Sequence, residues 1–314
     1  MTRFIYSMLE TPVLFIVFNR PDTTQKVFNK IREIQPKKLY ITSDGPRENN
    51  AEDNVNCQLV RTIVNEINWD CDVKKLYADQ NMGFSKRIKS ALDWFYTNEE
   101  KGIILEDDCL PSTSFFKYCE LMLEKHRDNE DIQVITGTNY CDHPISKKQD
   151  YFIADFGYIW GWASWRRVVQ NIQWETNYSL KEVKDKLICV YQDEEYVNHF
   201  YSIVHGNYNI KDCWDVEFFV FNLMNNKKSI FPNVNLISNI GNSGTHYINS
   251  ENKLLNIKTF EIDFNKFNVN NYIILPQKIK RKVIKEYNRK ANYLTFRDKL
   301  YILKKQIFKI LFNS

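Results

Sequence analysis

Strand-like and helix-like patterns alternate along the first third of the chain. The run PVLFIVFNR at 12–20 predicts a fully buried strand, and the next segment places Val27, Ile31 and Ile34 on one helical face. The alternation continues with strands expected within 37–46, 71–83 and 101–108 and helices expected at 51–68 and 84–100. This βαβαβαβ order predicts an α/β fold, in which a mostly parallel sheet is flanked by helices.

After residue 110 the pattern is mixed. Helices are expected at 114–127 and 213–226, and strands at 132–137 and 228–240. A Gly-rich turn, GNSGTHY, follows at 241–247.

Polar residues follow each of the four strands expected within residues 12–108. They lie in FNRP at 18–21, SDGP at 43–46, DQNMGFSKR at 79–87 and EDDC at 106–109. Open α/β sheets bind ligands beyond the carboxyl ends of their strands, so these four segments predict one common site.

Three consecutive acids, Glu106, Asp107 and Asp108, stand at the end of the fourth strand. Like charges this close raise one another's pKa, and a divalent cation compensates them. Oxygen ligands with no nearby Cys or His set favour Mg²⁺ or Mn²⁺. In an extended chain Glu106 and Asp108 face one side and Asp107 the other, so we expect the three to have different roles.

Tryptophans are concentrated in the segment YFIADFGYIWGWASWRR, which contains Trp160, Trp162 and Trp165. Buried tryptophans usually belong to the hydrophobic core. Flat aromatic rings also suit the apolar faces of sugar rings, and Gly161 leaves room for a close approach. Both interpretations stay open.

Composition and charge narrow the class of protein. The 314 residues are 43% hydrophobic, which suits a folded globular chain, and the seven cysteines form no C-x-x-C pair, so we expect reduced thiols. The net charge is +4, but the stretch 278–314 alone carries +10. No membrane-spanning run or signal peptide is evident, so we expect a cytoplasmic protein.

The basic C-terminal stretch places Leu300, Leu303 and Ile307 at helical spacing between lysines. Such a helix can lie on an anionic membrane surface, and it can equally pack on the domain with its lysines in solvent. No nucleic-acid-binding module accompanies the charge, so nucleic acid is not an expected partner.

The run IILEDDCLPSTSFFKYC at 103–119 resembles the acid motif and following helix of GT-A glycosyltransferases, most closely the inverting N-acetylglucosaminyltransferase I type. The resemblance extends over roughly residues 10–248, and this run looks closer still to bacterial surface-polysaccharide transferases of that fold. The resemblance implies a Rossmann-like GT-A domain at 1–248, with a nucleotide-binding half at about 10–110 and an acceptor half at about 111–248. It leaves 249–314 as a C-terminal extension of basic amphipathic helices.

Matching positions imply a role for each candidate residue. By this resemblance Asp108 would bind the metal that bridges the nucleotide diphosphate, Asp107 would reach the ribose, and Glu106 would orient the neighbouring loop. Asp215 falls at the position of the catalytic base, and Glu217 is its rival. The other implied contacts are Phe18, Arg20 and Asp44 around the nucleotide base, Arg87 near the phosphates, and Trp160, Gly161 and Trp162 on the acceptor side.

His246 lies in the Gly-rich turn and is a candidate for a late metal or phosphate contact. An exposed loop histidine is the alternative interpretation of the same residue.

The resemblance implies a metal-dependent inverting glycosyltransferase that uses Mn²⁺ or Mg²⁺ and a UDP-linked sugar. Its acceptor would be a glycan or lipid-linked glycan of bacterial surface polysaccharide synthesis, met at the inner face of the cytoplasmic membrane. Two other classes are weighed against it. A nucleotidyltransferase would carry a Gly-rich phosphate loop after the first strand, where this chain has FNRPDTT, and a carbohydrate-binding protein has no need of the acids.

Overall fold

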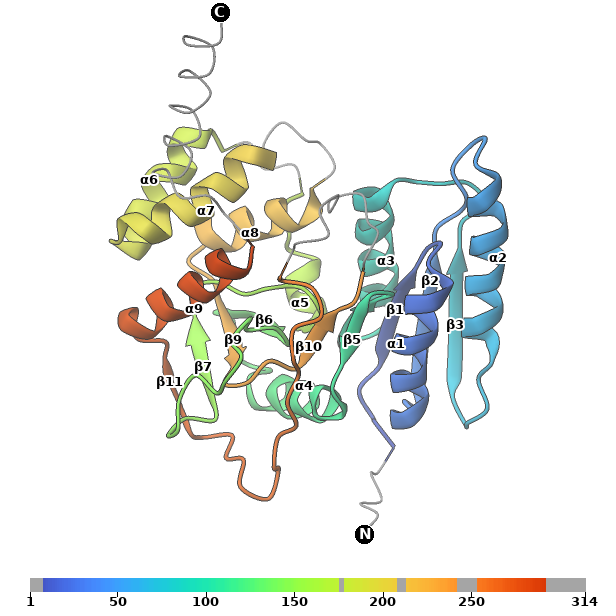
Figure 1. Ribbon diagram of the computed structural model, residues 1–314, viewed down its shortest axis with the longest axis horizontal. Helices are drawn as coiled ribbons and strands as arrows, with labels where there is room; N and C mark the ends of the chain where they lie inside the picture. Colours follow the sequence, from blue (N-terminus) through green and yellow to red (C-terminus); the bar gives the residue numbers. More distant parts are fainter. Residues whose placement is uncertain (1–7, 175–177, 208–212, 242–252, 292–314) are drawn as a thin grey trace, which may run out of the picture.

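Residues 8–174, 178–207, 213–241 and 253–291 are described by the computed structural model of the chain, which is built around a nine-stranded sheet (Figure 1). Among its eight strand pairings, five are parallel and three are antiparallel. Helices flank the sheet. The α/β fold with a mostly parallel central sheet is therefore confirmed.

The predicted alternation of strands and helices forms the N-terminal part of the sheet. In chain order its elements are β1 (Val13–Val17), α1 (Pro21–Ile34), β2 (Lys38–Ser43), α2 (Ala51–Asn65), β3 (Asp72–Tyr77), α3 (Phe84–Asn98) and β4 (Lys101–Glu106). The four strands pair in parallel in the spatial order β4-β1-β2-β3. Their carboxyl ends consequently share one edge of the sheet.

The second half of the chain extends the sheet beyond β4. Its strands are, in spatial order, β8 (Trp162–Trp165), β6 (Ile132–Thr136), β9 (Lys228–Pro232), β7 (Tyr151–Ala154) and β11 (Tyr272–Ile274). A separate antiparallel pair is formed by β5 (Cys109–Pro111) and β10 (Ile237–Asn239).

The two larger hydrophobic clusters of the described residues hold the layers together. The larger one lies between the sheet and the helices α1, α2, α3, α4 (Thr113–Lys125) and α5 (Arg166–Val169). The smaller one joins β7 and β9 to α6 (Leu180–Tyr191), α7 (Glu194–Asn207), α8 (Trp214–Met224) and α9 (Gln277–Lys290). In Figure 1, helices α6 to α9 gather on the side of the molecule opposite β2 and β3.

The strand expected over 228–240 is two strands in the structure. β9 ends at Pro232, which has no backbone N–H to donate to a neighbouring strand. The fully buried Asn235 then turns the chain, because its side chain accepts from the Asn139 N–H at 3.1 Å and donates to the Ile237 carbonyl at 2.7 Å. This turn carries β10 over to β5.

The described part of the C-terminal segment packs on the same body. β11 pairs with β7, and Glu261 accepts hydrogen bonds from the Thr113 and Ser114 N–H groups at the start of α4 (3.1 and 2.8 Å). In α9, Val283 and Ile284 are fully buried. The described residues 253–291 therefore pack on the domain, and the boundary expected at residue 248 stays a prediction.

The apolar stripe of Leu300, Leu303 and Ile307, with the lysines between them, lies outside the described residues. Within the described part of the chain, no helix combines the length and the apolar character needed to cross a membrane.

Candidate functional site

The three acids occupy a tight turn at the carboxyl edge of the sheet. β4 ends at Glu106 and β5 begins at Cys109, so Asp107 and Asp108 form the connection between two strands. The Ile240 N–H, just after β10, donates to the Asp108 carbonyl at 2.8 Å and fixes the turn from the other side. The chain thus bends at the position where an extended strand would send neighbouring carboxylates to opposite faces.

Arg20 is the cation of this turn. It stands between the end of β1 and Pro21, the first residue of α1, and β1 pairs with β4 so that Ile16 lies opposite Glu106. Its guanidinium donates to Asp108 Oδ2 at 2.7 Å and forms an ion pair with Asp107. The Phe18 N–H donates to the other oxygen of Asp107, Oδ2, at 3.2 Å. The first strand end therefore holds both aspartates.

The turn carries more negative than positive charge. Burial raises the pKa of Glu106 to about 8, the carboxylates of Asp108, Asp107 and Asp215 add to the rise, and Arg20 opposes it. Burial also raises the pKa of Asp107, again against the effect of Arg20. A single guanidinium does not balance these carboxylates, so the turn favours a further cation.

A divalent cation fits the donor set of this turn. The described residues contain no cluster of three or more His, Cys, Asp and Glu side chains arranged to hold a metal ion. Mg²⁺ and similar hard cations, however, are commonly held by one or two carboxylates plus phosphate oxygens of a ligand. Asp108 is the part of the turn with the more exposed carboxylate, at 13% against 3% for Asp107. His246 lies outside the described residues.

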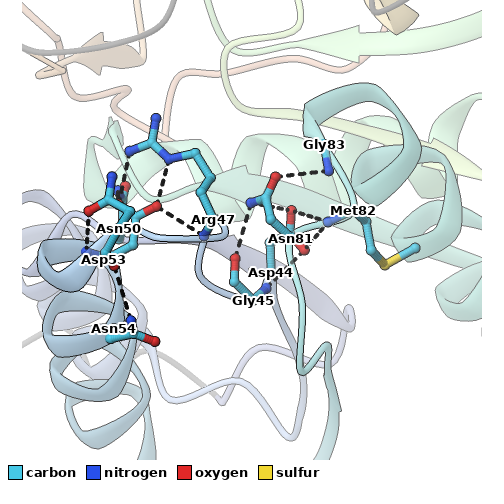
Figure 2. A network of polar contacts seen from close by, with 10 residues as sticks. Asp44, Gly45, Arg47, Asn50, Asp53, Asn54, Asn81, Met82 and Gly83 are labelled. Carbon is cyan, nitrogen blue, oxygen red and sulfur yellow. Dashed lines mark hydrogen bonds and ion pairs between the residues drawn. The ribbon is translucent and has the colours of Figure 1, made fainter.

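Asp44 joins two loops at the neighbouring strand ends. Its carboxylate accepts hydrogen bonds from the Gly45 N–H at 2.9 Å, the Met82 N–H at 3.0 Å and Asn81 Nδ2 at 3.1 Å (Figure 2). Burial raises the pKa of Asp44, and the Met82 and Gly45 N–H groups counteract the rise. The loops after β2 and β3 are pressed together here, because a Cβ on Gly45 would lie 2.5 Å from the Gln80 backbone.

Arg87 lies inside the fold, below the loop after β3. Its guanidinium donates to the Thr42 hydroxyl and the Leu76 carbonyl, and its side chain is almost fully buried. Burial lowers the pKa of Arg87, although the nearby Asp44 opposes this. In this structure Arg87 ties β2 to β3, so the expected phosphate contact is not one that its placement favours.

Asp53 is a site residue that the sequence did not single out. It is 1% exposed, and it accepts from Arg47 Nε at 2.6 Å, Arg47 Nη2 at 2.9 Å and Asn19 Nδ2 at 2.6 Å. Arg47 lowers the pKa of Asp53 to about 2, and Asn19 contributes. The Arg47 guanidinium also lies 5.7 Å from the centre of the Phe18 ring. Asp53 thus connects the loops after β1 and β2. Figure 2 shows its contacts with Arg47.

The spacing of Asn50 and Asp53 is the one sequence signal that could have drawn attention to Asp53. Asn50 caps α2 by accepting from the Asp53 N–H at 3.0 Å, as expected for a polar residue three positions ahead of an acid at a helix start. Nothing in the sequence indicates that the Asp53 side chain turns toward Arg47 instead.

The two candidate bases lie in the first turn of α8 but have different neighbours. Asp215 is close enough to the acid turn to raise the pKa of Glu106. Glu217 forms an ion pair with Lys89 of α3 at 2.5 Å, and the Lys89 ammonium lies 5.2 Å from the centre of the Trp174 ring. Of the two carboxylates, Asp215 is therefore the one associated with the acids.

The tryptophan segment divides between core and surface. Trp162 is 1% exposed and packs against Trp214 and Phe218, with ring centres 6.2 and 5.7 Å away, so the core interpretation is correct for it. Gly161 has φ +61°, and a Cβ there would lie 2.4 Å from the side chain of Ile237. The group that approaches Gly161 is thus Ile237 of β10, and neither Gly161 nor Trp162 is placed as an acceptor wall.

Trp160 keeps a partly exposed side chain. Its ring centre lies 5.4 Å from that of Tyr140, and its carbonyl accepts from the Thr138 hydroxyl at 2.8 Å. It is the member of the expected acceptor group that this structure leaves near the surface.

Comparison with known proteins gives distant structural similarity. No protein-family model matches the chain, and no curated protein is significantly similar to it. A mannosyltransferase from Pyrobaculum calidifontis, solved with GDP-Man and Mn²⁺, is 10% identical with a TM-score of 0.40, covering 69% of this chain and 70% of its own. A 4-diphosphocytidyl-2C-methyl-D-erythritol synthase from Anaerococcus prevotii is 9% identical with a TM-score of 0.32, covering 62% and 84%.

An inositol-1-phosphate CTP transferase from T. maritima is 8% identical with a TM-score of 0.30, covering 58% of this chain and 82% of its own. The three structures thus include a glycosyltransferase and two nucleotidyltransferases. At such low TM-scores they do not distinguish one activity from another.

Proposed function

We propose that this chain is a metal-dependent glycosyltransferase of the GT-A type, which moves a sugar from a nucleotide diphosphate to an acceptor hydroxyl. The observation that carries the proposal is the acid turn: Glu106, Asp107 and Asp108 meet Arg20 at the carboxyl edge of a mostly parallel sheet. This is the edge at which open α/β sheets bind nucleotides.

Departure of the nucleotide diphosphate requires its charge to be neutralised. Asp108 would hold the divalent cation, which supplies that neutralisation when it is bound. Asp107 is fixed by the Phe18 N–H and Arg20, which suits a carboxylate that orients the donor's ribose. Arg47, held by Asp53 beside the Phe18 ring, is a further candidate for the donor side.

Deprotonation of the acceptor hydroxyl requires a base across from the leaving group. Asp215 is the better candidate, because it lies near enough to the acid turn to raise the pKa of Glu106. A base on that side implies an inverting displacement. The partly exposed Trp160 supports an acceptor with an apolar sugar face nearby.

The finer identity of the reaction is part of the same proposal. We infer a UDP-linked donor and a glycan or lipid-linked acceptor of bacterial surface polysaccharide, met at the inner face of the membrane. In α9, Arg281 pairs with Asp193 at 2.5 Å and Lys290 with Asp142 at 2.5 Å, so these basic groups have protein partners. We infer that the basic residues of 292–314 carry the membrane role.

Release of nucleoside diphosphate tests the proposal. The full chain is incubated with UDP-, GDP- and dTDP-sugars and Mn²⁺, with and without added pyrophosphate. Nucleoside diphosphate, nucleoside triphosphate and sugar 1-phosphate are separated by ion-exchange chromatography. We expect nucleoside diphosphate from at least one donor, and loss of this activity in Asp108→Ala with retained folding.

Asp128→Ala is the matched control, because this acid is 86% exposed and pairs only with its neighbour Arg127 among the described ion pairs. Conversion of the nucleotide sugar and added pyrophosphate to nucleoside triphosphate and sugar 1-phosphate would instead identify a nucleotidyltransferase. Binding without turnover of any donor would support a carbohydrate-binding protein.

A further inference from the structure

Arg20 binds one oxygen atom of Asp108, which is the candidate metal ligand. The hydrogen bond of 2.7 Å from Arg20 Nη1 ends on Asp108 Oδ2, and the other oxygen, Oδ1, accepts from the Cys109 thiol at 3.4 Å. Gly241 lies directly against the same carboxylate: a Cβ at this position would lie 2.6 Å from Asp108 Oδ2. Each oxygen of Asp108 thus accepts one hydrogen bond from a protein group.

Two cations on one carboxylate repel each other. A guanidinium at hydrogen-bonding distance neutralises Asp108, and a divalent ion that uses the same carboxylate meets the field of that positive charge. Binding of the ion therefore works against the ion pair between Arg20 and Asp108.

Arg20 has a second partner that makes an exchange possible. Its Nη2 pairs with Asp107, which is nearly buried and is also held by the Phe18 N–H. Arg20 can therefore release Asp108 and remain paired with Asp107. The freed edge of a guanidinium fork matches phosphate oxygens, which arrive with the proposed donor.

We propose that Arg20 competes with a divalent cation for Asp108. In the nucleotide-free protein this competition weakens cation binding, and Arg20 moves from Asp108 to the diphosphate when donor and cation bind together. The inference rests on the proposed function, since it assumes a cation on Asp108 and a diphosphate beside it. It adds a positioning role for Arg20 that acts through Asp108.

Two affinities with opposite expected shifts test this role. Binding of Mn²⁺ alone to the nucleotide-free full chain is measured from the electron paramagnetic resonance signal of free Mn²⁺. Binding of UDP and of GDP is measured by calorimetry at saturating Mn²⁺. Wild type is compared with Arg20→Gln and Arg20→Met, which remove the charge, and with Arg20→Lys, which keeps it.

We expect Arg20→Gln and Arg20→Met to bind Mn²⁺ about 10-fold more tightly than wild type and the nucleotide about 10-fold more weakly, within the usual range of coupling between two ligands. Arg20→Lys should stay within about 3-fold of wild type for Mn²⁺, because its charge remains. A purely structural role for Arg20 would weaken both affinities together.

Asp108→Asn separates failure of this inference from failure of the proposed function. Mn²⁺ binding that disappears in Asp108→Asn but is no tighter in the folded charge-free Arg20 variants would overturn the competition and leave the metal site in place. Mn²⁺ binding that is indifferent to Asp108→Asn would overturn the proposed metal site and the competition with it. Circular dichroism identifies which charge-free variant is folded, and either one decides the question.

Discussion

Gly241 offers a way to move Asp108 without removing it. A Cβ at this position would lie 2.6 Å from Asp108 Oδ2 and 3.1 Å from Arg20 Nη1, against ordinary contacts of 3.4 to 4 Å. In Gly241→Ala the carboxylate must therefore shift by about 0.8 Å, and the ion pair with Arg20 must shift with it. Gly241 is not among the residues with positive φ, so alanine is compatible with the backbone there.

The expected effect is on turnover more than on folding. Misplacing a catalytic group by about 1 Å can cost about 10²-fold in rate, so we expect Gly241→Ala to lower donor turnover by about 10- to 100-fold. Overpacking at one site costs typically about 1–3 kcal/mol of stability, which should leave the chain folded. The assay is steady-state release of nucleoside diphosphate at saturating Mn²⁺, alongside thermal unfolding.

Gly206→Ala is the matched control. This glycine lies in α7, and a Cβ there would have no heavy atom within 4 Å. Alanine in a helix is favoured over glycine by about 1 kcal/mol, so the control should be at least as stable as wild type and equally active. Full activity of Gly241→Ala would show that the position of the Asp108 carboxylate does not matter for the reaction.

Three further predictions address the base, the docking of α9 and the C-terminal stretch. Asp215→Asn should lower turnover about 10²-fold or more while donor affinity stays within a few-fold, and Glu217→Gln should lower turnover less; the reverse order in steady-state kinetics would move the base to Glu217. Burial lowers the pKa of His199 from 6.5 to about 4, so the unfolded chain takes up a proton first and stability present above pH 6.5 is lost as the pH falls toward 4. Between pH 7 and pH 5, urea unfolding should therefore show wild type losing about 2 kcal/mol more than His199→Gln, and equal losses would contradict the prediction. Deletion of 292–314 should abolish binding to anionic vesicles at low salt but leave donor hydrolysis intact, and vesicle binding equal to that of the full chain would refute the membrane role.

The regular part of the fold and the acid turn could be predicted because both depend on local patterns. β1 and β4 are largely continuous apolar runs, as is usual for buried parallel strands, and all four N-terminal strands end in polar segments that the sheet brings to one edge. The topology rule alone therefore places Arg20 near Glu106, Asp107 and Asp108. The ion pairs between residue 20 and residues 107 and 108 join parts of the chain far apart in sequence, so their geometry comes only from the structure.

Burial and side-chain direction were the features that could not be predicted. Gly161 and Trp162 looked suited to a sugar, but the pairing of β10 with β5 brings Ile237 against Gly161, and α8 covers Trp162 with Trp214. Arg87 faces inward for a similar reason: Thr42 and the Leu76 carbonyl, on neighbouring strands, accept from it. Such contacts depend on long-range packing, which leaves no periodic signal in the sequence.

Magnetic resonance of the fresh reaction products tests the central claim most directly. The full chain is supplied with Mn²⁺ and the nucleotide sugar that it turns over, and ¹H and ³¹P spectra are recorded before the released sugar equilibrates. The account predicts a nucleoside diphosphate together with a sugar of opposite anomeric configuration to the donor, and neither product in Asp108→Ala. Retention of configuration would contradict the inverting mechanism, and sugar 1-phosphate as a phosphorus product would contradict glycosyl transfer itself.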